Sequence, residues 1–269
     1  MPLMSPMDGT ETSSPLHSAN PSLQLIRTLS FNIQVGMHTA HYAHYLTGAW
    51  RHVLPSRGVR RNLDRIAELL CDYDCVGLQE VDAGSLRTAQ LNQVEYLAAR
   101  AGFSHFEVAV NRNLAPLARH ALAVLSRVPL HDVRHHPLPG RVPGRGALEV
   151  HLRLLGRPPL QWINTHLALG TADRQRQLEA IAGLIKPGSD CMLMGDLNCT
   201  PAEISANAAI QRSGLHATHH LPTHPSWKPR RCLDHILLTP GLQASSAIVL
   251  EQRLSDHCPV ALTLKLRTA

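Results

Sequence analysis

Apolar residues follow two different periods along this 269-residue chain. Short apolar runs bounded by polar residues or turns are typical of buried strands, whereas recurrence at every third or fourth position is typical of helices. Helical spacing occurs at 42–53, 63–70, 94–101 and 171–186. Gly102 stands where the third helix should end, and Thr171 is a candidate N-cap for the fourth. Strand-like runs occur at 23–33, 75–81, 103–110, 121–126, 147–155, 160–167, 191–196, 233–238, 247–250 and 259–266.

The order of these elements constrains the fold class. Strands outnumber helices, and several consecutive strands have short connections, which excludes a simple repeat of alternating strands and helices. We therefore expect an α/β protein in which two mixed β-sheets pack face to face with helices outside. Residues 1–22 are rich in Ser, Pro and Thr without periodicity, and we expect a disordered N-terminal tail. Residues 23–268 contain neither a linker nor an internal repeat and form one predicted domain.

Polar and ionisable residues stand at or just beyond the ends of many predicted strands. A buried strand has no reason of its own to end in a charged group, because burial of a charge is costly unless the group is paired or bound to metal. Repetition of this pattern indicates one polar cleft where the strand ends meet. The residues concerned are Asn32, Gln79, Glu80, His166, Asp196, Asn198, Asp234, His235, Ser255, Asp256 and His257.

The chemical types in this set are those of a hard-metal site. Asp, Glu and Asn side chains offer the oxygen ligands that such cations require, and His166 and His257 can transfer protons near neutral pH. No cysteine belongs to the set, which argues against a soft metal. The combination suits attack of an activated water at phosphorus, with a metal that neutralises the phosphate charge.

Six motifs occur in order along the chain: SFN, LQEV, NTH, GDLN, LDHI and SDHCPV. Each is unspecific alone, but together they resemble the endonuclease/exonuclease/phosphatase superfamily, which includes DNase I-like nucleases, inositol-polyphosphate phosphatases and sphingomyelinases. The resemblance covers nearly all of the chain after residue 23. It implies a four-layer α/β sandwich and a hydrolase of phosphate ester bonds that uses Mg²⁺, with Mn²⁺ as the alternative ion.

The resemblance also implies a role for each carboxylate and amide. Glu80 resembles the principal Mg²⁺ ligand, Asn32 would support it, and Asp256 would be a further carboxylate of the metal site. Asp196 would orient or deprotonate the attacking water. Asn198 would hydrogen-bond the phosphate and hold Asp196.

The two histidines of the motifs complete the expected catalytic set. By the same resemblance His257 would contact the phosphoryl oxygens or take the proton, with Asp234 orienting its ring. His166 would stabilise the transition state or serve the leaving group. A purely structural hydrogen bond is the alternative for Asn32 and Asp234.

Several neighbouring residues have other interpretations. We interpret His235 as a packing residue and expect Pro201 to start a helix. Arg119–His120 departs from the residues that many relatives carry there, which leaves the partner of His166 open. Arg145 and the basic residues before LDHI either meet an anion or are solvated loop charges.

The composition narrows the partners only slightly. A formal net charge of +6 suits an anionic substrate, nucleic acid or lipid headgroup, but an Arg-biased surface explains it equally well. The 6 cysteines form no C-x-x-C pair, and several lie in apolar runs, so we expect buried thiols in a reducing compartment. No apolar stretch reaches membrane-spanning length, and the N-terminus lacks a signal-peptide pattern, so we expect a cytoplasmic protein.

Three functions are compatible with these residues. The first is a phosphodiesterase or phosphomonoesterase for a small or lipid-linked substrate, the second is a DNA or RNA nuclease, and the third is an inactive binding module. The complete residue set argues against the third. The first is favoured over the second, because the chain has neither an aromatic and basic stacking pattern nor a basic stripe. The sequence does not predict the oligomeric state.

The segment 36–61 follows directly on the strand that carries Asn32. Its helical stripe, which includes Tyr45 and Trp50, is unusually aromatic for a chain with 4% aromatic residues. We expect it either to pack on the body of the protein or to form a lid over the rim of the cleft, where it would contact the non-phosphate part of the substrate.

Overall fold

The structure is a computed structural model that describes residues 23–37, 57–154 and 157–267. Its core is a pair of six-stranded β-sheets. The first sheet has the order β11 (Gln243–Val249), β12 (Val260–Arg267), β1 (Leu23–Asn32), β2 (Cys75–Asp82), β4 (Ala118–Ser126) and β3 (His105–Leu114). The second has the order β5 (Leu130–Pro137), β6 (Gly146–Leu152), β7 (Leu160–His166), β8 (Cys191–Asp196), β10 (Asp234–Leu238) and β9 (His216–Ala217).

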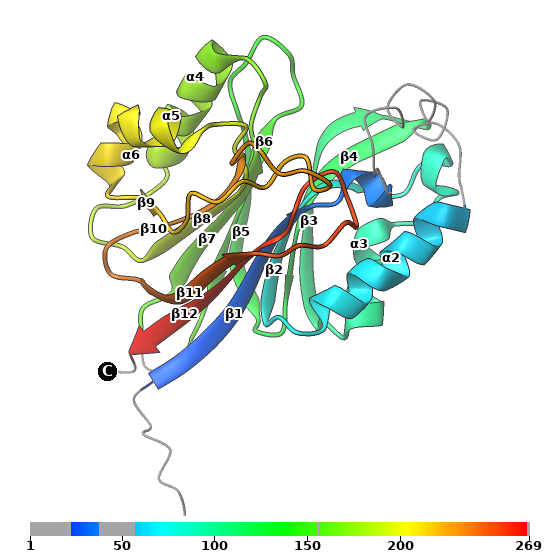
Figure 1. The fold of residues 1–269 in the computed structure, drawn as a ribbon, viewed down its shortest axis with the longest axis horizontal. Coiled ribbons are helices and arrows are strands. Elements are labelled where there is room, and N and C mark those ends of the chain that lie inside the picture. The colour runs from blue at the N-terminus through cyan, green and yellow to red at the C-terminus, as the bar shows by residue number, and fades with distance from the viewer. Residues whose placement is uncertain (1–22, 38–56, 155–156, 268–269) are drawn as a thin grey trace, which may run out of the picture.

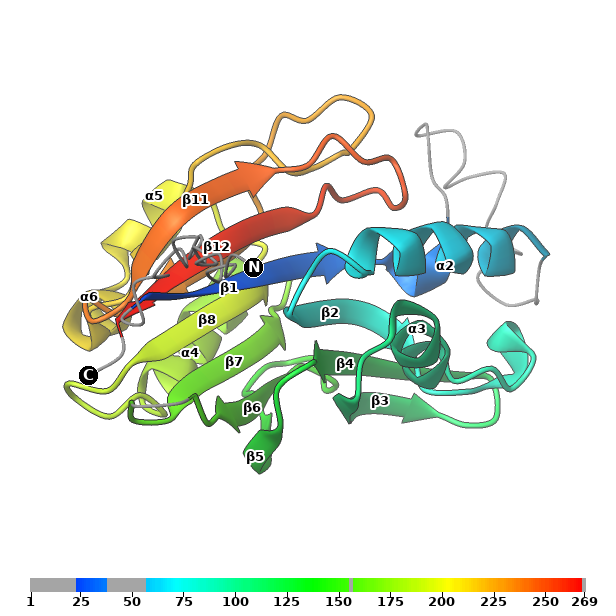
Figure 2. The same ribbon diagram turned by 90° about the horizontal axis from the view of Figure 1, so that it is seen from below.

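Helices cover the outer faces of the two sheets (Figure 1). The first sheet carries α2 (Arg57–Leu70) and α3 (Gln93–Ala101), and Figure 2 shows both helices beside β1 and β2. The second sheet carries α4 (Thr171–Ala182), α5 (Pro201–Ala206) and α6 (Ala208–Ser213). Two short 3₁₀ helices, η1 (Gln34–Gly36) and η3 (Leu86–Thr88), lie in loops. The predicted sandwich of two mixed sheets with helices outside is therefore confirmed.

Three apolar clusters define the four layers. One cluster lies between the sheets and contains Trp162 and Met194. A second packs the first sheet against α2 and α3, and a third packs the second sheet against α4, α5 and α6. Neighbouring residues of β8 divide between layers, since Met194 faces the other sheet while Leu193 faces the helices. A strand covered on both faces is apolar throughout, which explains the continuous run at 191–196.

The strand directions bring the polar strand ends to one edge of the sandwich. β1 runs parallel to β2, and β7 runs parallel to β8, so each pair ends at the same edge. The antiparallel strands β12 and β10 begin where these pairs end. The register places His166 opposite Asp196 and Asp196 opposite Asp234.

A buried polar bridge joins the two sheets behind this edge. Gln79 Nε2 donates to Asn164 Oδ1 over 2.7 Å, and Asn164 Nδ2 donates to the carbonyls of Leu78 and Ala123 over 2.9 Å each. Both amides are fully buried and hydrogen-bonded. The bridge ties β2 to β7, and these strands carry Glu80 and His166.

Local predictions agree with the structure at some positions and fail at others. Gly102 ends α3 in the left-handed conformation at φ 72°, as expected, and α5 begins at Pro201. Thr171 is not an N-cap: Gly170 holds that position, and the Thr171 hydroxyl accepts a hydrogen bond from Arg174. The eight-residue strand β5 and the two-residue strand β9 were not expected. The predicted helix at 42–53, most of the 36–61 segment and the predicted tail at 1–22 lie outside the described residues.

None of the helices within the described ranges combines the length and the apolar character needed to cross a membrane.

Candidate active site

The residues predicted from the six motifs converge at the edge where the strands end. Asn32, the last residue of β1, donates from Nδ2 to Glu80 Oε1 over 3.2 Å and to Asp196 Oδ2 over 3.1 Å. Its Oδ1 accepts from the backbone N–H of Gln34 over 3.1 Å. One amide from the first sheet thus links a carboxylate of its own sheet to a carboxylate of the second.

Asp196 is the central carboxylate of this cluster. It is buried and lies within reach of both predicted histidines, with Oδ2 3.4 Å from His166 Nε2 and 3.7 Å from His257 Nε2. Burial raises the pKa of Asp196 to about 7, although the nearby His257 charge opposes the rise. A carboxyl with this pKa can accept a proton near neutral pH.

Asn198 stabilises the turn that follows β8 through two hydrogen bonds. Its backbone N–H donates to Asp196 Oδ1 over 3.0 Å, and its Nδ2 donates to the carbonyl of Leu167 over 3.0 Å. At φ 50° it adopts the left-handed conformation, which Asn tolerates better than most residues. Asn198 therefore holds Asp196 as expected, while its contact with a phosphate stays a prediction.

His257 forms a hydrogen bond with Asp234, the first residue of β10. Asp234 Oδ2 lies 2.8 Å from His257 Nδ1 and also accepts from the Thr223 hydroxyl over 2.5 Å. Burial disfavours the charged imidazole, but Asp234 and Asp196 outweigh it and raise the pKa of His257 well above its ordinary value. At Asp234 burial acts to raise the pKa, but the His257 charge and the hydrogen bonds from His257 and Thr223 together outweigh it and lower the pKa of this carboxyl. The pair is therefore an imidazolium held by a carboxylate.

His166, in contrast to His257, is a neutral imidazole. It ends β7 between Glu80 and Asp196, with Nδ1 3.8 Å from Glu80 Oε1. Burial lowers the pKa of His166 well below its ordinary value, and the charges of Arg145 and His257 add to this effect. A neutral ring beside a charged one gives the site a hydrogen-bonding group and a cation at the same time.

Glu80 projects into the cleft because β2 is irregular where it passes the site. The pairing of β2 with β4 shifts register between Leu78 and Val81, and Glu80 has φ 53°. Such a bulge re-aims a side chain out of a regular strand. Loss of water and the nearby Asp256 charge raise the pKa of Glu80. Two carboxylates that oppose each other's ionisation form a favourable place for a cation.

The donor set fits a divalent hard cation. Glu80 and Asp256 supply oxygen atoms, and Asp234 Oδ1 is buried without a hydrogen-bond partner. Within the described ranges, no Lys or Arg forms an ion pair with Glu80, Asp196 or Asp234. In two groups at this site the candidate ligand atoms lie within 4.8 Å of one another: His224, Asp256 and His257, and Asp196, Asp234 and His257. A third group, His219, Cys232 and His235, contains no carboxylate.

The structure also adds residues that the motifs did not identify. His224 lies against the site, with Nε2 4.0 Å from Asp256 Oδ2 and its ring centroid 4.7 Å from that of His257. Thr223 donates to Asp234, as noted above. Both belong to an irregular segment before β10, where no strand pattern marks them. Their loop position gave no signal in the sequence.

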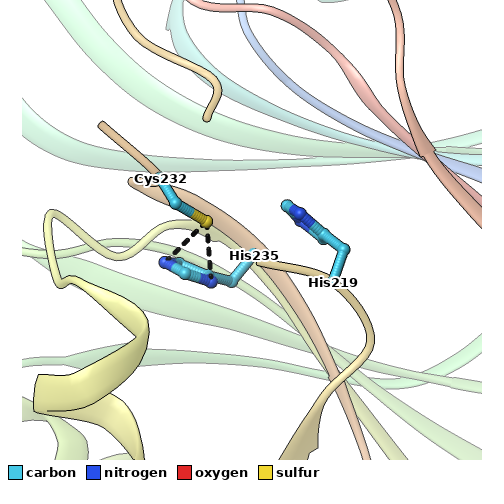
Figure 3. Close-up of side chains that lie close together, drawn as sticks. All are labelled: His219, Cys232 and His235. Atoms are coloured by element: carbon cyan, nitrogen blue, oxygen red, sulfur yellow. Dashed lines mark hydrogen bonds between the residues drawn. The ribbon is translucent and has the colours of Figure 1, made fainter. Parts of the chain in front are cut away.

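His235 is fully buried and lies close to the buried side chains of Cys232 and His219 (Figure 3). Its Nε2 lies 2.9 Å from the carbonyl of Cys199, and its ring stacks on His219 with centroids 5.9 Å apart. Cys232 Sγ lies 3.8 and 3.9 Å from the two ring nitrogens of His235. These nearly equal distances place the sulfur over the ring and not along a nitrogen lone pair, which supports the interpretation of His235 as a packing residue.

Comparison with known proteins gives one family match. The model of the Endonuclease/Exonuclease/phosphatase family matches residues 29–257. This range includes the first five motifs, the SDH of the sixth and every residue of the cluster described above. No curated protein matches the sequence.

Solved structures share the fold at low sequence identity. An endonuclease/exonuclease/phosphatase from Beutenbergia cavernae aligns with a TM-score of 0.68 and 21% identity, over 90% of this chain and 72% of that one. A mannosyl-6-phosphatase from Bacteroides thetaiotaomicron aligns with a TM-score of 0.65 and 16% identity, over 89% and 99%. TDP2 from D. rerio, complexed with a single-stranded DNA product, aligns with a TM-score of 0.65 and 19% identity, over 89% and 98%.

Proposed function

The chain belongs to the endonuclease/exonuclease/phosphatase family, whose members hydrolyse phosphate esters, and we propose that it is a Mg²⁺- or Mn²⁺-dependent phosphoesterase that activates water with Asp196. The observation that carries the proposal is the position of Asp196. Its carboxyl lies between a neutral His166 and a charged His257 and has a pKa of about 7.

Each group at the site suits one part of this reaction. Asp196 accepts a proton from the attacking water, since its pKa of about 7 lies near neutral pH. The His257 imidazolium, held by Asp234, attracts the phosphoryl oxygens as negative charge develops. His166 donates a hydrogen bond without adding charge, either to the phosphoryl group or to the leaving oxygen.

The cation would be held by Glu80 and Asp256, with Asn32 fixing Glu80 through its amide. A bound divalent ion would neutralise phosphate charge and polarise the phosphorus centre. Asp196 and Asp234 are buried carboxylates without a Lys or Arg ion pair among the described residues, an arrangement that is otherwise unfavourable. This is the physical reason to expect an ion here.

The substrate class is a separate part of the proposal. Solved structures with this fold include both the phosphatase and the DNA-bound protein named above, so the fold alone leaves the substrate open. A cleft of about 230 Å³ opens beside Glu80 and His166. A small or lipid-linked phosphate ester is favoured over a nucleic acid, because the sequence has neither an aromatic and basic stacking pattern nor a basic stripe.

The experiment is a substrate screen with matched controls. Purified protein would be treated with EDTA, reloaded with Mg²⁺ or Mn²⁺, and assayed against bis(p-nitrophenyl) phosphate, p-nitrophenyl phosphate, plasmid DNA and RNA. We expect hydrolysis of at least one small ester, lost with EDTA, restored by either ion and absent in Asp196→Asn. Full activity after exhaustive chelation, or wild-type turnover by Asp196→Asn, would contradict the proposed mechanism. Degradation of DNA or RNA alone would favour the nuclease.

A further inference from the structure

A second part of the cleft, beyond Glu80 and His166, is built from basic residues. Its walls come from β3, from β4 and from the loop that precedes β6. Arg112 lies on β3, His120 on β4, and Arg145 at the end of the loop. Because Glu80 and His166 line the same cleft, a ligand bound at the metal site could extend directly toward these side chains.

The two arginines lack acidic partners. Among the described residues, no carboxylate oxygen lies within 4 Å of the guanidinium group of Arg112 or Arg145. Arg87 differs from them, because it is paired with the buried Asp82 over 2.5 Å. Arg112 is exposed and Arg145 is half-buried, so water screens part of their mutual repulsion, and a bound anion would remove the rest.

The position of Arg112 is set by a glycine. Gly144 has φ +101°, and a Cβ built on it would lie 2.8 Å from Cβ of Arg112 and 3.2 Å from its Cγ and Cδ. Only a residue without a side chain lets the arginine stem lie so close to the loop. The stem is therefore packed against the loop that carries Arg145, and the two arginines are held as neighbours.

Charge changes sign along the cleft. Arg145 interacts with Glu80 and Asp196 on one side and with Arg112 on the other. His120 is neutral near pH 7, because burial and the charge of Arg87 lower its pKa to about 4. Arg87 Nη2 lies 3.4 Å from its Nδ1. The end near Glu80 is thus acidic and suited to a metal, whereas the end near Arg112 is basic and suited to an anion.

We propose that this basic end binds a second phosphate of the substrate, one that is not cleaved. The natural substrate would then carry at least two phosphate groups, with the scissile one beside Asp196. Guanidinium groups bind phosphate through paired, charge-assisted hydrogen bonds. The inference rests on the proposed function, because it takes the site of Glu80 and Asp196 as the site of cleavage.

The second phosphate could belong to a small molecule or to a nucleotide, and a competition assay separates the two sources. Hydrolysis of bis(p-nitrophenyl) phosphate would be measured at saturating Mg²⁺ with two pairs of inhibitors. One pair is fructose 6-phosphate and fructose 1,6-bisphosphate, and the other is thymidine 5′-phosphate and thymidine 3′,5′-bisphosphate. Within a pair only the second phosphate differs.

We expect the wild-type protein to bind the bisphosphate of at least one pair about 10-fold or more tightly, since a charge-assisted hydrogen bond contributes about 1.5–3 kcal/mol. The pair that shows the preference identifies the source. Arg112→Ala should abolish the preference, and Arg112→Lys should retain part of it. Arg212→Ala, at an exposed arginine on α6, should leave the preference intact.

Equal inhibition by both members of both pairs, or a preference that survives in Arg112→Ala, would overturn the inference. Failure of the proposed function has a different result, namely no hydrolysis of any substrate in the screen by the wild-type protein. In that case isothermal titration calorimetry with the same four compounds and Mg²⁺ still measures the preference. The binding result is therefore independent of turnover.

Discussion

Asp234 acts on the proposed reaction through His257. Its Oδ2 holds His257 Nδ1 at 2.8 Å, and the negative charge keeps the ring protonated despite burial. Thr223 in turn fixes the carboxylate through its hydroxyl. Removing one member of this hydrogen-bonded series should therefore change the protonation and the orientation of the His257 imidazole, with little effect on the core around it.

For this reason Asp234→Asn should lower kcat by about 100-fold, the usual range for a mispositioned acid or base. His257→Ala should lower it by at least as much. Thr223→Ser keeps the hydroxyl and provides the matched control, with kcat close to wild type. Steady-state kinetics together with a thermal melt would measure this. A wild-type kcat in folded His257→Ala would contradict the assignment of the imidazolium.

Glu80 is expected to bind the cation directly. Glu80→Gln preserves shape but removes the charge that opposes Asp256 and attracts the cation. Activity should fall strongly at low Mg²⁺ and recover in part when the ion concentration is raised. Activity titrated against Mg²⁺ would show a higher half-saturating concentration. An unchanged titration curve would mean that Glu80 does not hold the ion.

At the scale of elements, the site depends on how β7 and β8 approach each other. Gly195 has φ +141°, and a Cβ at this position would lie 1.9 Å from the carbonyl oxygen of Thr165 on β7. The next residue is Asp196, and the residue after Thr165 is His166. A glycine therefore permits the close strand contact that brings these two catalytic candidates together.

Gly195→Ala should consequently destabilise the protein by at least about 2 kcal/mol, because the side chain meets backbone and the φ value is strained. Gly183→Ala is the matched control: that residue has φ −66° at the end of α4, where alanine fits. It should raise stability by about 0.5 kcal/mol. Urea unfolding measures both changes, and equal stability of the two variants would refute the close-approach argument.

At the scale of the whole molecule, buried histidines couple the stability of the fold to pH. Burial lowers the pKa of His219 from 6.5 to about 4, and the neighbouring His235 and His220 add to the effect. Between these pH values the unfolded chain binds a proton that the folded chain does not. The contribution of His219 to stability is thus complete above pH 6.5 and is lost as the pH falls toward 4.

His219→Gln should make the free energy of unfolding less dependent on pH. Wild-type protein should lose about 2 kcal/mol more stability than this variant between pH 7.5 and pH 5, since one pKa unit corresponds to about 1.4 kcal/mol. Urea unfolding at the two pH values provides the comparison. His216→Gln, at an exposed histidine of β9, is the control. Parallel losses in wild type and His219→Gln would contradict the prediction.

The sequence alone determined the parts of this protein that local patterns encode. Apolar runs identified most strands, because a strand covered on both faces must be apolar along its length. Polar strand ends and the order of the motifs identified the residues that meet around Asp196. Gly102 predicted a helix end for the same local reason, since it adopts a left-handed conformation there.

Only the tertiary structure decided which residues become partners across the two sheets. The sequence left the partner of His166 open, and strand register places Asp196 and Glu80 beside it. Thr223 belongs to a loop without periodicity, so its contact with Asp234 depends on the path of the chain. Arg145 was equally compatible with solvent and with an anion. Its closeness to Arg112 arises from the packing of a loop on a strand more than 30 residues away in sequence, an arrangement that no local pattern records.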